Sequence, residues 1–228
     1  MKAISMSRIW LRARQSAVSL WCDHNAIAAT EFAVIVPLML VMFFGTIEYS
    51  SGVAVDRKSS LVARTLSDLT SQSWYQNGAP VQNLTDSVMT NVFTATMAIL
   101  QPYAATPAQE RVSEIYVDST KTAWIQWSRA ATFAAGATQA TLTTSSRSPG
   151  DNVTTLVPAA LLVKQTYLIL SEVSYLYQPT IGYVMAPSGV TLADSAYTRP
   201  RQFACLSYTS ISSLPNFAGV TQPACPTP

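Results

Sequence analysis

Charged residues are scarce in this chain and histidine is almost absent, and both shortages exclude functions. Only 11% of the 228 residues are charged and the net charge is +2, with a mean hydropathy of +0.21. This composition is unlike that of a cytosolic enzyme, and it gives no reason to expect nucleic-acid binding. The single histidine, His24, precedes a long apolar segment. We therefore expect no histidine-dependent triad and no histidine-ligated metal site in the rest of the chain.

Sequence motifs for nucleotide and calcium chemistry are also missing. Neither Gly-x-Gly-x-x-Gly nor Gly-Lys-Ser/Thr occurs, so neither nucleotide-binding loop applies, and no group of acids has calcium-loop spacing. A carboxylate pair of the glycosidase kind is the remaining option, and it could only come from Asp86, Glu110, Glu114, Asp118, Asp151, Glu172 and Asp194. Two acids lie close together by chance in many proteins, so these residues are weak evidence for a catalytic carboxylate pair. We expect no enzyme activity, no cofactor and no small-molecule substrate.

A long apolar run near the N-terminus dominates what is present. Residues 32–47 carry no charge, and with its flanks the run reaches the roughly 17–25 residues that a helix needs to cross a bilayer core of about 30 Å. Glu31 stands at its start, where an ionisable group is by default a functional residue; the alternative is a carboxylate that reaches back to the lipid headgroups. Pro37 removes one helix hydrogen bond and is expected to bend the helix.

The charges around the run predict its orientation. Four basic residues and one acid precede it, whereas the charges at 56–58 nearly cancel. The positive-inside rule therefore places residues 1–25 in the cytoplasm and residues from about 52 onward outside it. A cleaved secretory signal is the competing interpretation, although its apolar region is usually shorter. A lipoprotein anchor at Cys22 fits less well, because the apolar run follows that cysteine.

These residues resemble a known family. Small residues, then Glu-Phe-Ala-x-x-x-Pro, then an apolar run that closes in Gly-x-x-Glu, resemble the N-terminus of the TadE-like minor pilins (pseudopilins) of tight-adherence (Tad), Flp-type pili. The matching positions are Glu31, Phe32, Ala33, Pro37, Gly45 and Glu48. Weaker similarities lie at 115–128, 171–179 and 197–201.

The resemblance implies a precursor whose basic leader is removed by a prepilin peptidase. The acidic residue is then the fifth of the mature chain, which puts the cut between Ala26 and Ile27. The family usually has Gly before the cut, and Ala26 departs from that pattern, so the place of cleavage stays open. Glu31 would pair with the N-terminal amine of a neighbouring subunit. The implied partners are the inner membrane, the prepilin peptidase, other Tad pilins and the assembly platform proteins with their export ATPase.

The remaining pattern predicts an α+β head on a long helix. Apolar residues recur seven, four and three positions apart, at Val55, Val62, Leu66 and Leu69. The membrane helix should therefore continue as an amphipathic helix to about Thr70, with Arg57, Lys58 and Arg64 in solvent. A second helix is expected at 84–100, capped by Thr85 or Asp86. The expected domains are a leader (1–26), a transmembrane helix (27–50), an amphipathic extension (51–75) and an extracytoplasmic head (76–228).

Strand patterns fill the head. Residues 112–118 and 123–129 alternate around a polar turn and predict a β-hairpin. Further strands are expected within 162–177, with a bend near Ser171, and within 191–201. Turns or irregular structure are expected at 72–80, 132–150 and 202–228. The result is a mainly antiparallel sheet packed on the N-terminal helix, as in type IV pilins.

Two cysteines and two arginines near the C-terminus complete the prediction. Outside the cytoplasm, Cys205 and Cys225 could form a disulfide, and closing a loop of about 20 residues stabilises the fold by roughly 3 kcal/mol; two free thiols are the alternative. Arg199 and Arg201 suit an anionic partner or, more simply, a solvated strand edge.

Together these features predict a minor pilin or pseudopilin that takes part in assembly of a Tad pilus. It would cross the bacterial inner membrane once, with its N-terminus in the cytoplasm and its head in the periplasm or outside the cell. The alternative is a membrane-tethered periplasmic binding or sensor domain with no pilus role. A secreted hydrolase is disfavoured, because the head has no histidine.

Overall fold

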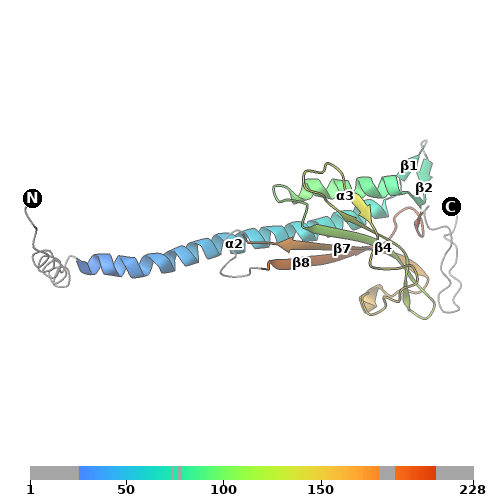
Figure 1. The fold of residues 1–228 in the computed structure, drawn as a ribbon. Coiled ribbons are helices and arrows are strands. Elements are labelled where there is room, and N and C mark those ends of the chain that lie inside the picture. The colour runs from blue at the N-terminus through green and yellow to red at the C-terminus, as the bar shows by residue number, and fades with distance from the viewer. Residues whose placement is uncertain (1–25, 73, 77–78, 180–187, 209–228) are drawn as a thin grey trace, which may run out of the picture. The chain divides into compact units, whose positions relative to one another are not determined.

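The structure is a computed structural model that describes residues 26–72, 74–76, 79–179 and 188–208 (Figure 1). The predicted leader, up to residue 25, and Cys225 lie outside the described residues. The chain divides into two compact units, residues 1–50 and residues 51–228.

Helix α2 (Ala26–Ser71) is 46 residues long and contributes residues to both units. Its sequence contains few residues that end a helix, because it has one proline and its two glycines, Gly45 and Gly52, stand apart. Pro37 lies inside the helix and does not end it. The amphipathic part was expected to reach about Thr70, and the helix ends at Ser71, which confirms that boundary.

The second unit is built on a five-stranded antiparallel sheet with the order β6-β5-β4-β7-β8. Its strands are β4 (Ala108–Val117), β5 (Ala123–Thr132), β6 (Thr141–Thr143), β7 (Thr166–Tyr177) and β8 (Val190–Thr198). A long N-terminal helix packed on a mainly antiparallel sheet is the α+β fold that the sequence predicts.

The hairpin of β4 and β5 is confirmed, and both strands are longer than expected. Its turn depends on Asp118, whose carboxylate accepts from the backbone N–H of Thr120 at 2.7 Å and of Thr122 at 2.9 Å. Burial alone would raise the pKa of Asp118, but these hydrogen bonds and one from Trp124 lower it below its ordinary value. The backbone at Lys121, with φ of 68°, completes the turn. The carboxylate therefore replaces missing strand partners for these N–H groups.

Strand β7 is one continuous strand, with no break in register at the position where a bend was expected. Ser171 keeps its register with Val112 on β4 and Ala196 on β8. Its hydroxyl donates to the carbonyl of Ala63 in α2 at 2.5 Å. The serine does not interrupt the strand pairing as expected; it is fully buried and forms a contact between sheet and helix.

Helix α3 (Asp86–Leu100) matches the predicted second helix, and Thr85 is its N-cap, accepting from the N–H of Val88 at 3.4 Å. The ammonium of Lys58 lies at its other end, donating to the carbonyls of Ile99 at 2.7 Å and Gln101 at 2.6 Å. The expectation that Lys58 is solvated was therefore wrong, because the last carbonyls of a helix attract a cation.

Both sheet faces are covered. One face packs on α3 and on residues 51–71 of α2 (Figure 1), in a core that includes Val62, Leu66, Phe93, Ile169 and Val173. The other face is covered by the segment between β6 and β7, including a short helix η1 (Ala159–Leu161), and its core includes Ile115, Ile125, Val153, Leu168 and Leu170.

Short strands replace some of the predicted turns. The pair β1 (Trp74–Gln76) and β2 (Ala79–Val81) stands where a turn was expected, and β6 stands inside the predicted 132–150 loop. Strands β3 (Asn83–Leu84) and β9 (Ser207–Tyr208) pair in parallel, so the predicted irregular tail contains a short strand. None of these strands has enough residues for a periodic signal, and only β3 and β9 pair across a long stretch of the chain.

Candidate functional site

The first unit exposes a long apolar surface on α2. Phe32 is 70% exposed and Val34 is 76% exposed. The other exposed large apolar residues of this segment are Ile35, Leu38, Met39, Leu40, Val41, Met42, Phe43, Phe44, Ile47 and Tyr49. A contiguous apolar surface of this kind marks a membrane or protein contact.

Helix α2 is also the one helix, among the described residues, that is long and apolar enough to cross a membrane. Length and composition alone would also admit the core helix of a soluble protein or a signal sequence. A core helix is mostly buried, whereas none of the most apolar window of α2 is buried. One N-terminal apolar helix of this kind indicates a membrane anchor or signal anchor.

The three predicted assembly residues lie on this exposed surface. Glu31 and Phe32 are exposed on α2, near its N-terminal end. Pro37 leaves the carbonyl of Ala33 without the N–H that an ordinary residue would donate. A Cβ added at Gly45 would meet nothing within 4 Å, so no contact inside the chain requires glycine there.

The predicted processing site lies where the described helix begins. Ala26 is the first residue of α2 and Ile27 the second. Cys205 is fully buried, and its carbonyl accepts from Gln82 Nε2 at 3.2 Å. Because Cys225 lies outside the described residues, its pairing with Cys205 stays a prediction.

Two acids of the head are buried and belong to the core. Glu110 accepts from the hydroxyl of Thr96 on α3, at 2.8 Å to each carboxylate oxygen. Glu114 accepts from the N–H of Leu206 at 2.7 Å and from Trp127 Nε1 at 2.9 Å. Burial raises the pKa of both carboxyls to about 8, although these hydrogen bonds lower it in part. Each acid thus joins β4 to a separate element of the fold.

Glu172 lies on the other sheet face in a closed ion cluster. Arg147 donates from Nε at 2.6 Å and from its terminal nitrogen at 2.5 Å, and Arg111 donates at 3.2 Å. Burial alone would raise the pKa of Glu172, but the hydrogen bonds and charges of the two arginines lower it below its ordinary value. A carboxylate held in this way is not available as a general acid.

The other acids also have structural contacts. Asp86 lies 3.4 Å from the guanidinium of Arg129, whose carbon is 4.5 Å from the ring centre of Tyr208, and Tyr208 donates to Asp86. Asp151 accepts from the N–H of Ser148 at 2.6 Å. In the part of the chain that the structure describes, no group of three His, Cys, Asp or Glu could hold a metal ion.

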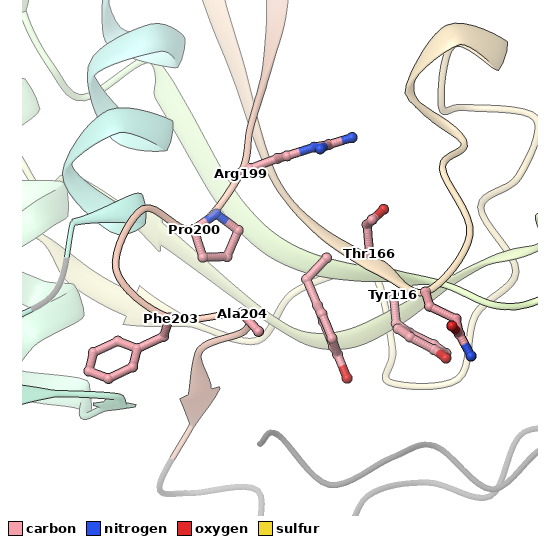
Figure 2. A pocket seen from close by; sticks show the side chains of 8 residues that line it. Tyr116, Thr166, Arg199, Pro200, Phe203 and Ala204 are labelled. Atoms are coloured by element: carbon pink, nitrogen blue, oxygen red, sulfur yellow. The ribbon is translucent and has the colours of Figure 1, made fainter. Parts of the chain in front are cut away.

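The two C-terminal arginines have different surroundings. Arg201 forms an ion pair with Asp68 of α2, and its backbone N–H donates to the carbonyl of Ser71 at 3.1 Å. Arg199 is exposed and lines an open pocket of about 350 Å³ (Figure 2). The pocket is lined by Tyr116, Gln165, Thr166, Tyr167, Arg199, Pro200, Phe203 and Ala204. Both arginines are exposed, so the interpretation as a solvated edge fits both, and Arg201 is in addition paired with Asp68.

Comparison with known proteins identifies the N-terminal helix. Residues 26–64 match the family model TadE, described as TadE-like protein. No curated protein and no solved structure matches the chain. The matched residues contain the exposed apolar surface with Glu31, Phe32 and Pro37, and they continue into the part of α2 that packs in the head core. This chain therefore carries a TadE-like segment over residues 26–64 of its N-terminal helix.

Proposed function

We propose that the chain is a minor pilin or pseudopilin that takes part in assembling a Tad pilus. The observation that carries this proposal is the TadE-like match over a helix that exposes most of its large apolar side chains between residues 32 and 49. An exposed apolar helix needs lipid or other subunits around it. A membrane-anchored pilin uses both, first in the membrane and then in the pilus.

The domain organisation follows from the proposal. Residues 1–26 are a cytoplasmic leader, residues 27–50 cross the inner membrane, and residues 51–75 extend the helix under the head. The head, residues 76–228, lies in the periplasm or outside the cell. The net basic charge before the apolar segment supports this orientation.

Glu31 gains its role through processing. Removal of the leader creates an α-amine at Ile27, and Glu31 is then the fifth residue. A carboxylate in apolar surroundings is strongly stabilised by a cation beside it. We assign Glu31 to pair with the amine of a neighbouring subunit, with Phe32 beside it and Pro37 bending the helix.

The N-terminus of the mature protein tests the proposal. Mass spectrometry of membrane fractions, with and without the prepilin peptidase, is expected to find a start at Ile27 that depends on the enzyme. An Ala26→Gly variant restores the usual family residue and should be processed at least as completely. An intact Met1 in both strains would contradict processing, and a start beyond the apolar segment would indicate an ordinary signal peptide.

The pocket beside Arg199 favours one alternative, a membrane-tethered binding or sensor domain. Two variants separate the two functions. The pilin proposal expects Glu31→Gln to abolish piliation and Arg199→Ala to leave it unchanged. A tethered receptor would show the reverse sensitivity in its signalling output, with no dependence on Glu31.

A further inference from the structure

The open pocket of Figure 2 lies at one edge of the five-stranded sheet, and we call it the distal pocket. Strand β4 ends at this edge with Val117, β7 begins there with Thr166, and β8 ends there with Thr198. Val117 pairs with Thr166, so these strand ends are neighbours. All residues that line the distal pocket belong to the second unit. Its geometry therefore depends on the head alone.

The distal pocket forms where helix α2 no longer covers the sheet. The helix ends at Ser71, whose carbonyl accepts from the backbone N–H of Arg201 at 3.1 Å. Tyr116 lies four positions after Val112 on β4, so both side chains share the sheet face that packs on the helices. Beyond the end of the helix, residues 199–204 border this face instead, and the pocket lies between them and the strands.

Two tyrosines form the wall of the pocket on the side of the sheet. Tyr116 on β4 pairs with Tyr167 on β7, and their ring centres are 5.0 Å apart. They form one buried cluster with Cys205 and are only 6% and 8% exposed. Packing therefore fixes their positions, and the small part of each side chain that remains exposed faces the pocket.

Polar side chains form the rim of the pocket. Gln165 is exposed, and its φ of 57° lies in the left-handed region that residues other than glycine rarely adopt. Its backbone N–H donates to the carbonyl of Val117 at 2.8 Å, which holds this conformation. Backbone strain of this kind is concentrated at functional sites. The next residue, Thr166, donates its hydroxyl to the carbonyl of Val163 at 2.6 Å, so its oxygen is still able to accept a hydrogen bond.

Arg199 brings a positive charge to the pocket. Four other arginines of the head form ion pairs with acids: Arg111, Arg129, Arg147 and Arg201. Arg199 is exposed and forms no ion pair with the residues that the structure describes. Pro200 follows Arg199 and favours an extended backbone there. None of the described residues that line the pocket is acidic, so the guanidinium is available to an anionic ligand.

Two further cations lie at the same edge of the sheet. Lys121 is in the turn between β4 and β5, and Lys164 directly precedes Gln165. Both are exposed, and neither forms an ion pair within the described part of the chain. The carboxylate of Asp118 is engaged by the N–H groups of its own turn, and that of Asp68 by Arg201. Together with Arg199, these lysines make the edge attractive to anions.

We propose that the distal pocket binds a sugar that carries a carboxylate, a uronic acid. A guanidinium and a carboxylate form two parallel hydrogen bonds, so Arg199 binds the carboxylate. Sugar hydroxyls both donate and accept, and the amide of Gln165 and the hydroxyl of Tyr116 can do both in return. The volume of about 350 Å³ lies within the range of roughly 300–1,000 Å³ that is usual for small-ligand sites.

A sugar fits this pocket better than an acidic peptide does. A peptide is commonly bound along an open strand edge through backbone hydrogen bonds, whereas this pocket offers side-chain hydroxyl and amide groups beside one cation. Lys121 and Lys164, outside the pocket, suit the next carboxylates of an acidic polysaccharide. The inference goes beyond the proposed function and does not rest on it, because every residue involved belongs to the head.

Isothermal titration calorimetry of the full chain in detergent tests the inference. The probes are trimers of galacturonate, glucuronate and mannuronate, the matching neutral trimers of galactose, glucose and mannose, and triglutamate as an acidic peptide. At least one uronate trimer should bind, and its neutral counterpart should bind about tenfold more weakly or not at all. The inference is overturned if no uronate trimer binds, if the neutral trimer binds equally well, or if triglutamate binds as tightly.

Three variants localise the binding to the distal pocket. Arg199→Ala should weaken uronate binding about tenfold or more, and Arg199→Lys should recover part of the affinity. Gln165→Gly tolerates the left-handed backbone but lacks the amide, and it should weaken binding several-fold. Circular dichroism confirms that each variant is folded.

A matched control separates a specific site from general attraction between charges. Arg57→Ala removes the same charge from an exposed position on α2 and should leave the affinity within about twofold. Equal losses in Arg57→Ala and Arg199→Ala would overturn the inference, as would unchanged binding in both Arg199→Ala and Gln165→Gly. A failure of leader processing would instead refute the proposed function and leave uronate binding unchanged.

Discussion

The two parts of helix α2 have the same backbone conformation and opposite surroundings. At 32–49 the large apolar side chains are exposed, whereas at 51–71 Val55, Val62 and Leu66 are fully buried. The difference lies in the pattern of the sequence. An unbroken apolar run cannot be buried by one sheet face, whereas an apolar stripe with charges opposite it can. The first part therefore needs partners outside the chain, and the second belongs to the head.

The largest expected effect concerns a residue of the exposed part. Glu31→Gln should abolish pilus assembly, because it removes the charge that we propose pairs with a neighbour's amine, while the unfolding of the head stays unchanged. Glu31→Asp keeps the charge and should restore part of the assembly. Pili sheared from the cell surface measure the effect, and normal piliation of the glutamine variant would contradict it.

A leucine from each part makes the comparison quantitative. Leu66→Ala should destabilise the head by about 2–5 kcal/mol, because it leaves a cavity in the core. Leu40 is 47% exposed, so Leu40→Ala should leave the unfolding free energy within about 0.5 kcal/mol. Urea unfolding of both variants in detergent measures this, and equal losses would mean that the first part also packs on the head.

The buried acids make the stability of the head depend on pH. The folded-state pKa of Glu110 and Glu114 is raised to about 8 from 4.5. Their favourable contribution is therefore complete below pH 4.5 and is lost as pH rises through about 8. The unfolding free energy should fall by about 1.4 kcal/mol per pH unit and per acid over this window.

Denaturant unfolding at several pH values between 5 and 8 measures that slope. Glu110→Gln or Glu114→Gln should each remove about half of it. The pKa of Glu172 is lowered, so its contribution to the unfolding free energy has the opposite pH dependence. That contribution is lost as the pH falls below the ordinary pKa of a glutamate. A stability that rises between pH 5 and 8 would contradict the prediction.

The smallest expected effect separates two neighbouring basic residues in the second part of α2. Lys58→Met should cost about 1–2 kcal/mol, because the last carbonyls of α3 lose a charged donor. Arg57 is exposed, and Arg57→Met should change stability by less than about 0.5 kcal/mol. Thermal unfolding compares the two variants. Equal effects would show that the ammonium contact is not maintained in solution.

Sequence patterns predicted the features that are formed by residues close together in the chain. The apolar run, the stripe beyond it, the cap at Thr85 and the turn at Asp118 all involve residues close together in the chain, so their signals survive without a structure. The segment to which we assign pilus assembly belongs to this class. The residues Glu31, Phe32 and Pro37 are recognisable because they lie within one short stretch, which the TadE-like match also covers.

Contacts between distant residues could not be predicted in the same way. Lys58 and Ile99 are 41 positions apart, and Ser171 and Ala63 are 108 apart. In the sequence, Lys58 looks like any solvated lysine, and Ser171 looks like any serine that interrupts a strand. Only the fold shows that the first is hydrogen-bonded and the second is buried. Likewise, the different surroundings of Arg199 and Arg201 depend on Asp68, which only the fold brings near one of them.

The sequence by itself determined that a long apolar helix precedes an α+β head, because hydrophobic periodicity is a local property. Only the tertiary structure decided which acids are buried, where each cation binds, and that the ring of Tyr177 packs beside Gly52. These features depend on the register of β7 against β4, β8 and α2. That register is set by side chains packing across the whole core, and no single stretch of sequence contains it.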